Sequence, residues 1–349
     1  MQPYPDHQPR GQTSSKAAST VGGAFNSYDD TLNLDPRERA RAQKRHQDLT
    51  ALLLASGLVT LTFLQGSFAR KTMRKPLKDV DMVVVLAERL RADLERPGGP
   101  ARAMEMLRRI VAGAYPSASF DADGPSAHAL QITFADLPFT FDLVPALAGD
   151  DGEIVHIANR ELDRWEWSNA RTLNRVVSER NVRTDGRFVH QVRMGKALKD
   201  RYPDLDLCGL AYEALAHDSI FVAQPHDLAV AELLRHASTA VLGKILEPTG
   251  VEDLTADWDD DQRQRYAQRF ASLARRADEA VRLRADGAEP AAVDVWRTVF
   301  GDDFPAAPPQ SASDALAALG GGSITSAGRA VTTPRANQPS RPHRSWRTR

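Results

Sequence analysis

The run from Val80 to Leu86 constrains the fold more than any other part of the sequence. It reads VDMVVVL and is apolar apart from Asp81. Such a run is typical of a strand that is buried on both faces and therefore lies inside a sheet. Two acids, Asp79 and Asp81, open the strand. Alternate residues of a strand point to the same face, so we expect the two carboxylates to lie side by side.

A pair of neighbouring carboxylates needs a compensating charge. The two groups repel each other and do not both ionise unless a cation neutralises them, and Mg²⁺ is a hard ion that takes carboxylate oxygens and substrate phosphates. A third acid, Asp142, lies in FTFDLVPAL, another mostly apolar segment in which a lone carboxylate needs a partner. If this strand runs beside the first, Asp142 completes a two-ion site. One ion would activate an attacking hydroxyl, and the other would neutralise a leaving pyrophosphate.

The dipeptide Gly66–Ser67 predicts a phosphate-binding loop. It follows a predicted strand over 59–64 and precedes a predicted helical turn, SFARKT. Glycine lets a phosphate approach the backbone, and an exposed helix N-terminus and a serine hydroxyl donate hydrogen bonds to an anion. Positive charge follows at Arg70, Lys71, Arg74 and Lys75. We therefore expect this loop to hold a nucleotide triphosphate, with the metal ions on its other side.

The pattern along the chain predicts an α+β lobe followed by a helical lobe, with the active site in the cleft between them. Asp35 and Pro36 start a helix that runs to about Ser56. Further helices are expected over 101–114, 170–182, 188–201, 208–216, 227–246, 259–283 and 291–300, and strands over 59–64, 80–86, 117–122, 127–134, 139–144 and 154–157. The predicted divisions are a disordered arm over 1–34, the α+β lobe over 35–165, the helical lobe over 166–304 and a disordered tail over 305–349.

The composition indicates which partners and which cellular compartment to expect for the protein. The 349 residues carry a formal net charge of -1, so we expect no nucleic-acid partner. The single cysteine, Cys208, cannot form an internal disulfide, which favours a reducing cytoplasm. The first residues lack an apolar leader, and the longest apolar run, 49–64, is shorter than a membrane-spanning helix requires. We therefore expect no membrane segment.

The order of these features resembles the polymerase-β-like nucleotidyltransferases, whose pattern is a Gly-Ser pair, a spacer, a Dx[DE] pair and a distant aspartate. Within that superfamily the chain is most similar to the CD-NTases, the bacterial relatives of oligoadenylate synthase and cyclic GMP-AMP synthase in CBASS antiphage systems. The resemblance rests on Gln65 before the Gly-Ser pair, on GSFARKT, on FDLVPA around Asp142 and on EIVHIANRELDRWEWSN. It covers roughly residues 35–300.

The resemblance implies an activity and a set of roles. The enzyme would join nucleoside triphosphates into a cyclic or linear oligonucleotide second messenger. Asp79 and Asp81 would bind both Mg²⁺ ions, for which Mn²⁺ is an alternative, and Asp142 would bind one ion and help to deprotonate the acceptor hydroxyl. The nucleotide would be bound by Gln65, Gly66 and Ser67.

The helical lobe would contribute a further cation to the triphosphate. HQVRMGKALKD resembles the family's RxxK helix, which implies that Lys196 and Arg193 reach the phosphates. Lys199, one turn later, is the competing candidate. One departure concerns a serine that the family often has before the next helix. Here Cys208 and Gly209 stand in that region, so this contact is not expected.

The implied partners are the NTP substrates and an effector that is reached through the nucleotide product, in a bacterial cytoplasm. A flexible tail is compatible with a regulatory or conjugating partner. Two alternatives stay open. One is a nucleotidyltransferase that modifies a protein, an RNA or a small molecule, although such enzymes usually lack a large helical lobe. The other is a non-catalytic nucleotide-binding protein, which the presence of all three acids disfavours.

Overall fold

The computed structural model describes residues 18–122, 124–149 and 152–309. By their contacts the residues divide into two compact units. One unit is Asp29–Ser272, and the other combines Met1–Tyr28 with Leu273–Arg349. No helix among the described residues is long and apolar enough to cross a membrane.

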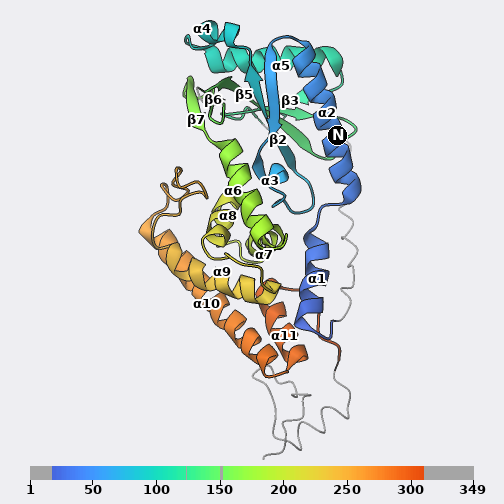
Figure 1. The fold of residues 1–349 in the computed structure, drawn as a ribbon, viewed down its shortest axis with the longest axis vertical. Helices are drawn as coiled ribbons and strands as arrows, with labels where there is room; N and C mark the ends of the chain where they lie inside the picture. Colours follow the sequence, from blue (N-terminus) through green and yellow to red (C-terminus); the bar gives the residue numbers. More distant parts are fainter. Residues whose placement is uncertain (1–17, 123, 150–151, 310–349) are drawn as a thin grey trace, which may run out of the picture. The chain divides into compact units, whose positions relative to one another are not determined.

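The first part of the unit Asp29–Ser272 is built around a mixed sheet (Figure 1). Its strands are β1 (Val59–Leu64), β2 (Asp79–Leu86), β3 (Ser119–Phe120), β4 (Leu130–Thr133), β5 (Thr140–Ala148), β6 (Val155–Asn159) and β7 (Arg164–Ser168). The order along the sheet is β1-β2-β5-β4-β3, and β6 joins β5 to β7. Only β2 and β5 run parallel, and their parallel pairing places the ends at which both strands begin beside each other.

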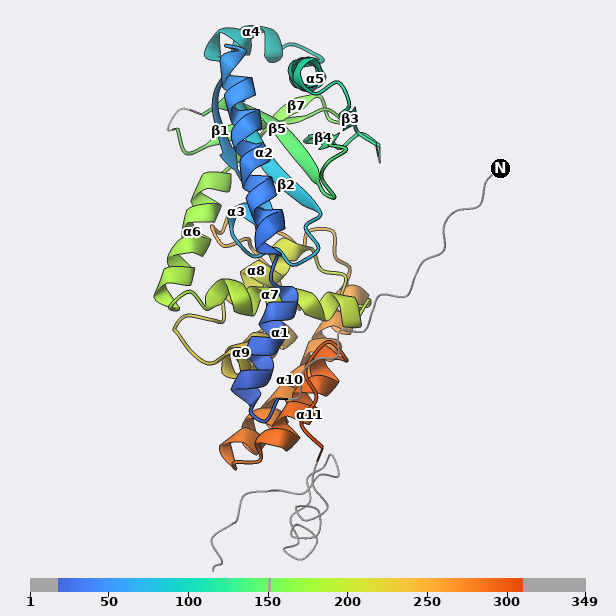
Figure 2. The same ribbon diagram turned by 90° about the vertical axis from the view of Figure 1, so that its right-hand side faces the viewer.

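Two long helices cover one face of this sheet (Figure 2). They are α2 (Pro36–Ala55) and α5 (Gly99–Ala114), and their apolar side chains, including Leu49 and Leu107, share one core with alternate residues of β2 and β5. The Asp35 side chain accepts a hydrogen bond from the Arg37 amide and caps α2, as the sequence predicts. Short helical turns, α3 (Gly66–Ala69), η1 (Glu88–Leu90) and α4 (Arg91–Leu94), lie in the connections.

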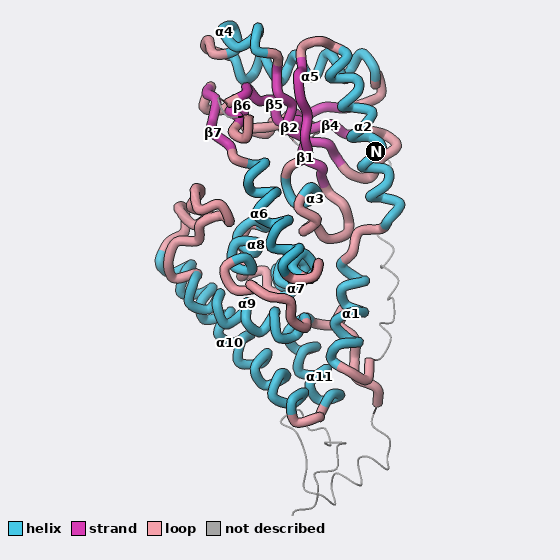
Figure 3. The backbone as a smooth tube through the Cα atoms, in the orientation of Figure 1, coloured by secondary structure: helices cyan, strands magenta, loops and turns pink. Residues whose placement is uncertain are grey.

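After β7 the described chain forms helices and no further strand of the sheet (Figure 3). The helices are α6 (Ala170–Arg183), α7 (Phe188–Arg201), α8 (Gly209–His217), α9 (His226–Ala240) and α10 (Asp260–Ala285), the last of which runs into the second unit. An α+β fold with a helical region after the sheet is thus confirmed. The prediction for α9 was too long, because the chain turns before Gly243 and the Ile245 amide donates to the Thr255 side chain instead.

The second unit corrects the expectation of a disordered arm over 1–34. Its described parts are residues 18–28 and 273–309, and residues 21–32 form α1 (Val21–Leu32). Phe25 is 1% exposed and meets the ring of Trp296 on α11 (Glu289–Phe300) edge-on, with 5.0 Å between centroids. A second edge contact joins Phe25 to Phe304. The Ala18 amide also donates to the Ala306 carbonyl, within the start of the predicted tail.

The error has a physical reason. The polar residues 1–20 dominate the composition of the predicted arm, whereas the buried residues of α1 recur at the spacing of one helix face, so the signal was periodicity and not composition. These residues are Val21, Ala24, Phe25, Tyr28 and Leu32. The remaining parts of the arm and tail predictions, residues 1–17 and 310–349, lie outside the described residues. The predicted boundary between residues 165 and 166 stays a prediction.

We expect the Phe25→Ala variant to lose about 3–5 kcal/mol of unfolding free energy, because the substitution leaves a cavity beside the rings of Trp296 and Phe304. Urea unfolding measures the change. The neighbouring exposed residue provides the control, since Asn26→Ala should lie within about 0.5 kcal/mol of wild type. Equal effects of the two substitutions would show that α1 does not contribute to the fold.

Candidate functional site

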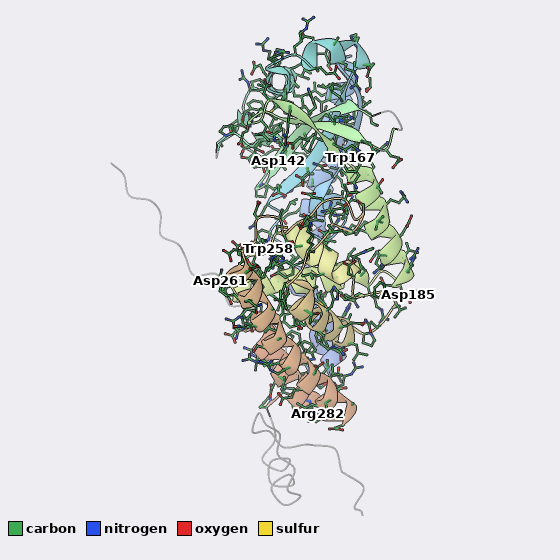
Figure 4. The ribbon with its side chains drawn as sticks, turned by 90° about the vertical axis from the view of Figure 1, so that its left-hand side faces the viewer. Asp142, Trp167, Asp185, Trp258, Asp261 and Arg282 are labelled. Atoms are coloured by element: carbon green, nitrogen blue, oxygen red, sulfur yellow. The ribbon has the colours of Figure 1, made fainter. Side chains whose placement is uncertain are left out.

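The three predicted acids come together because β2 and β5 are neighbours in the sheet. In the parallel ladder Asp81 lies opposite Asp142, and Asp79 lies opposite Thr140. The predicted adjacency of the two strands is therefore confirmed. The acids sit at the ends where the two strands begin, and Figure 4 labels Asp142 there.

All three acids face the side of the sheet that α2 and α5 leave uncovered. Along β2, Val80, Met82 and Val84 belong to the core under the two helices, whereas Val83 and Val85 belong to a smaller cluster on the opposite face. Strand alternation puts Asp79 and Asp81 on the side of Val83. The same parity places Asp142 with Val144, while Phe141 and Leu143 enter the larger core. An otherwise apolar face of the sheet thus carries three carboxylates at the start of β2 and β5.

The electrostatics of these acids reflect their crowding. Burial, and then the charge of Asp79, raises the pKa of Asp81 to about 6, and the Arg70 charge opposes this rise. Burial, followed by the charges of Asp81 and Asp79, raises the pKa of Asp142 to about 6. Burial also raises the pKa of Asp79, against the charge of Lys78. The local protein charges therefore do not compensate the negative charge of the cluster.

The donor set fits a divalent cation. Asp142 Oδ1 is buried and accepts no hydrogen bond from any described residue. A carboxylate oxygen without a donor, next to two further carboxylates, is what an oxygen-seeking ion requires. Among the described residues no group of three or more His, Cys, Asp or Glu side chains is arranged so that it could hold a metal ion by itself. Mg²⁺ is usually bound by one or two carboxylates together with substrate phosphates, so an open arrangement suits it.

Gln131 is a neighbour of the acids that the sequence analysis did not single out. It lies opposite Asp142 in the antiparallel β4–β5 ladder, and a hydrogen bond from its side chain lowers the pKa of Asp142 against the larger effect of burial. Gln131 Oε1 is buried and accepts no hydrogen bond from the described residues. The polar residue in the strand LQIT was visible in the sequence, but its place beside Asp142 required the register.

The Gly66–Ser67 turn lies directly beside Asp81. The Gln65 amide donates to the Asp81 carbonyl at 3.0 Å, which ties the turn to the start of β2. Gly66 has a φ of 69°, and a Cβ at this position would lie 1.9 Å from Asp81 Oδ2. Only glycine fits here without displacing the carboxylate. Within the described residues the Ser67 hydroxyl makes no hydrogen bond, so it is available to a ligand.

Lys196 and Arg193 lie on α7 and are buried, with 8% and 4% exposed. Lys196 Nζ donates to Glu213 Oε1 at 2.7 Å and to the Thr72 carbonyl at 3.3 Å. Arg193 donates to the Lys71 carbonyl at 2.9 Å and to Asp29 at 3.3 Å. Both side chains thus approach the segment that follows the Gly-Ser turn, and both are engaged by protein groups there.

Lys199 points elsewhere, since its ammonium lies 2.7 Å from Asp206 and it is 45% exposed. Cys208 precedes α8 and makes no side-chain cap. The sequence analysis missed Glu213, which is fully buried on α8 and accepts hydrogen bonds from Arg70, Thr72 and Lys196. A charged residue inside the apolar run GLAYEALA was its only signal.

The α+β fold that carries these acids and this turn is similar to that of solved CD-NTase structures. Residues 20–181 match the family model described as Second Messenger Oligonucleotide or Dinucleotide Synthetase domain. Over these residues the chain is similar to the synthetases that this family model describes.

Solved structures share the fold. The E. coli MS115-1 CdnC in its complex with HORMA-deltaN is 16% identical with a TM-score of 0.65, and the match covers 80% of this chain and 97% of that one. CdnG of Bradyrhizobium diazoefficiens, in complex with GTP, is 15% identical with a TM-score of 0.63 over 80% and 95% of the two chains. DncV of Vibrio cholerae, in a 3'-deoxy GTP bound form, is 12% identical with a TM-score of 0.60 over 82% and 96%. No curated protein sequence matches the chain.

Proposed function

We propose that this enzyme is a Mg²⁺-dependent synthase that joins NTPs into a cyclic or linear oligonucleotide, releases pyrophosphate and signals to an effector in antiphage defence. The observation that carries the proposal is the pairing of Asp81 with Asp142 across two parallel strands, beside Gly66. Acids on one face next to a glycine turn suit the transfer of a nucleotidyl group from a triphosphate to a hydroxyl.

Asp79, Asp81 and Asp142 would hold the metal ions. When bound, these ions lower the pKa of the acceptor hydroxyl and neutralise the charge on the leaving pyrophosphate. Gly66 and Ser67 would bind the triphosphate through the backbone and the free hydroxyl, together with Gln65. Lys196 and Arg193 would approach the triphosphate from α7, beside the segment to which they donate hydrogen bonds.

The reaction requires one bond to form and one to break. The oxygen of a ribose hydroxyl bonds to the α-phosphorus of an NTP, and the bond from that phosphorus to the β-phosphate oxygen breaks. The hydroxyl proton passes to the Asp142 carboxylate, and the electron pair leaves with pyrophosphate. A second transfer within the product would close a ring.

The partners of this chain follow from the same proposal. The related structures bind nucleotides, and one of them assembles with HORMA-deltaN. We propose NTPs as the substrates of this chain, a regulatory protein as its partner, and the bacterial cytoplasm as its location.

The deciding experiment is a synthesis assay. Purified protein is incubated with each radiolabelled NTP and with all four, in Mg²⁺ or in Mn²⁺, and the mixture is treated with phosphatase. We expect a phosphatase-resistant product from wild type and none from Asp79→Ala/Asp81→Ala. The matched control is Asp93→Ala/Glu95→Ala, which removes two exposed acids with the same spacing and should leave the product unchanged.

Other outcomes are informative. Label on a protein, an RNA or a small molecule in place of an oligonucleotide would identify a modifying nucleotidyltransferase. Nucleotide binding without any transfer would identify a non-catalytic protein. A product that persists in the double Asp variant would show that the acids have been assigned wrongly.

A further inference from the structure

A buried ion-pair network surrounds Glu213 on α8. Glu213 is 0% exposed, and its Oε2 accepts from Arg70 Nε at 2.6 Å. Its Oε1 accepts from the Thr72 hydroxyl and from Lys196 Nζ, each at 2.7 Å. The Thr72 hydroxyl, which is also fully buried, in turn accepts from Lys196 at 3.2 Å. Both oxygens of the carboxylate therefore accept hydrogen bonds from named donors.

Glu213 is the acid that both cations of the network share. Arg70 and Lys196 are both cations with little exposure, and a buried charge is costly unless it is paired and hydrogen-bonded. The attraction of Lys196 and Arg70 outweighs the effect of burial and holds the pKa of Glu213 low, at about 2. Glu213 is therefore ionised at neutral pH and serves both cations.

Backbone hydrogen bonds connect the network to the Gly66–Ser67 turn. The Thr72 amide donates to the Ser67 carbonyl at 3.0 Å, and the Arg70 amide donates to the Gly66 carbonyl at 3.2 Å. Arg70 and Thr72 thus bond to Glu213 through their side chains and to the turn through their backbone amides. No other acid among the described residues contacts both Arg70 and Thr72.

The geometry points to Glu213 as a positioning residue of the nucleotide-binding turn. It anchors the segment 70–72 to α7 and α8 and so fixes the backbone and the hydroxyl that meet the triphosphate. Lys196 is linked to the same segment through Glu213 and Thr72. The expected change in the KM for NTP rests on the proposed function. The expected change in the mobility of the turn does not.

The first test is Glu213→Gln, which keeps the shape and removes the charge. Lost or weakened bonds to Arg70 and Thr72 should let the turn move, so we expect the KM for NTP to rise about tenfold or more. Once substrate is bound the acids are unchanged, so kcat should stay within about threefold of wild type. Asp200→Asn, which breaks the exposed ion pair with Arg74, should change neither constant and is the matched control.

A second readout does not need activity. Hydrogen exchange of the free protein should become faster in Glu213→Gln over residues 66–74 and stay unchanged in β2. If wild type makes no product, the proposed function fails while this measurement still decides the inference. Unchanged exchange together with an unchanged KM would overturn the inference.

Two further variants separate positioning from folding. Thr72→Val removes only the hydroxyl that links Glu213 and Lys196 to the segment, and it should raise KM even if Glu213→Gln folds poorly. Lys196→Met combined with Glu213→Gln removes an opposite pair of buried charges, so it should recover thermal stability while KM stays high. A wild-type KM in the double variant would show that Glu213 only neutralises Lys196 and would overturn the inference.

Discussion

Asp81→Asn is expected to lower synthesis at least about 10³-fold and, in the absence of metal, to raise the thermal stability of the protein. The loss of activity follows because the carboxylate beside Asp142 and Gly66 would no longer bind the metal ions that stabilise the developing charge. The gain in stability follows because burial and the charge of Asp79 make the ionised carboxylate unfavourable in the folded protein.

The sign of the stability effect comes from the pKa of Asp81. Burial and the charge of Asp79 raise it from 3.8 to about 6, so between these values the folded state keeps a proton that the unfolded state has lost. Stability therefore falls as pH rises through this window, and the whole penalty is present above pH 6. Removing the charge should return about 1–2 kcal/mol at pH 7.5, after allowance for partial exposure, which is a few degrees in Tm.

Two scans of thermal unfolding check this prediction. In metal-free buffer the midpoint of Asp81→Asn should exceed that of wild type at pH 7.5, and the difference should shrink toward pH 4. Addition of Mg²⁺ with a non-hydrolysable NTP analogue should stabilise wild type and leave the variant unchanged. Asp93→Asn, at an exposed acid of α4, should behave as wild type throughout. A variant that is less stable than wild type in metal-free buffer would contradict the electrostatic account.

Gly66→Ala is expected to lower kcat/KM about 10²-fold with a moderate loss of stability. The added Cβ would stand 1.9 Å from Asp81 Oδ2 and 2.8 Å from its Cγ. The carboxylate must then turn away from its place opposite Asp142, and a displacement of about 1 Å in a catalytic group costs about 10²-fold. The φ of 69° adds strain of about 1–2 kcal/mol for alanine.

Gly113→Ala is the matched control for this substitution. Gly113 lies in α5, and a Cβ there would meet nothing within 4 Å. Alanine should leave the activity unchanged and stabilise the helix by up to about 1 kcal/mol. Steady-state kinetics and urea unfolding of the two variants measure both effects. Activity of Gly66→Ala within threefold of wild type would mean that the turn does not position Asp81.

Local sequence signals predicted most of the elements around the site. The strand β1 and the helix α7 have the predicted bounds, because periodic apolar residues and clear breakers frame them. The short strand β7 was missed, since RWEWS alternates charged residues with tryptophans and Trp167 is 45% exposed (Figure 4). It is a strand because β6 offers it a paired edge, which is a contact rather than a local propensity.

The sequence by itself determined the acids, the glycine and the buried strand. Asp79 and Asp81 share a face because a strand repeats every two residues, and no tertiary contact is needed to know it. The tertiary structure alone decided which strand lies beside this pair, and it brought Asp142 opposite Asp81 and Gln131 opposite Asp142.

The environment of Lys196 was likewise decided by the tertiary structure and not by the sequence alone. The sequence placed a lysine on a helix, whereas the fold buried it against Glu213, 17 residues later in the chain, and against Thr72, 124 residues earlier. Periodicity reports which face of an element a side chain occupies. It carries no information about the element packed on that face, because that choice is made by the burial of apolar surface over the whole chain.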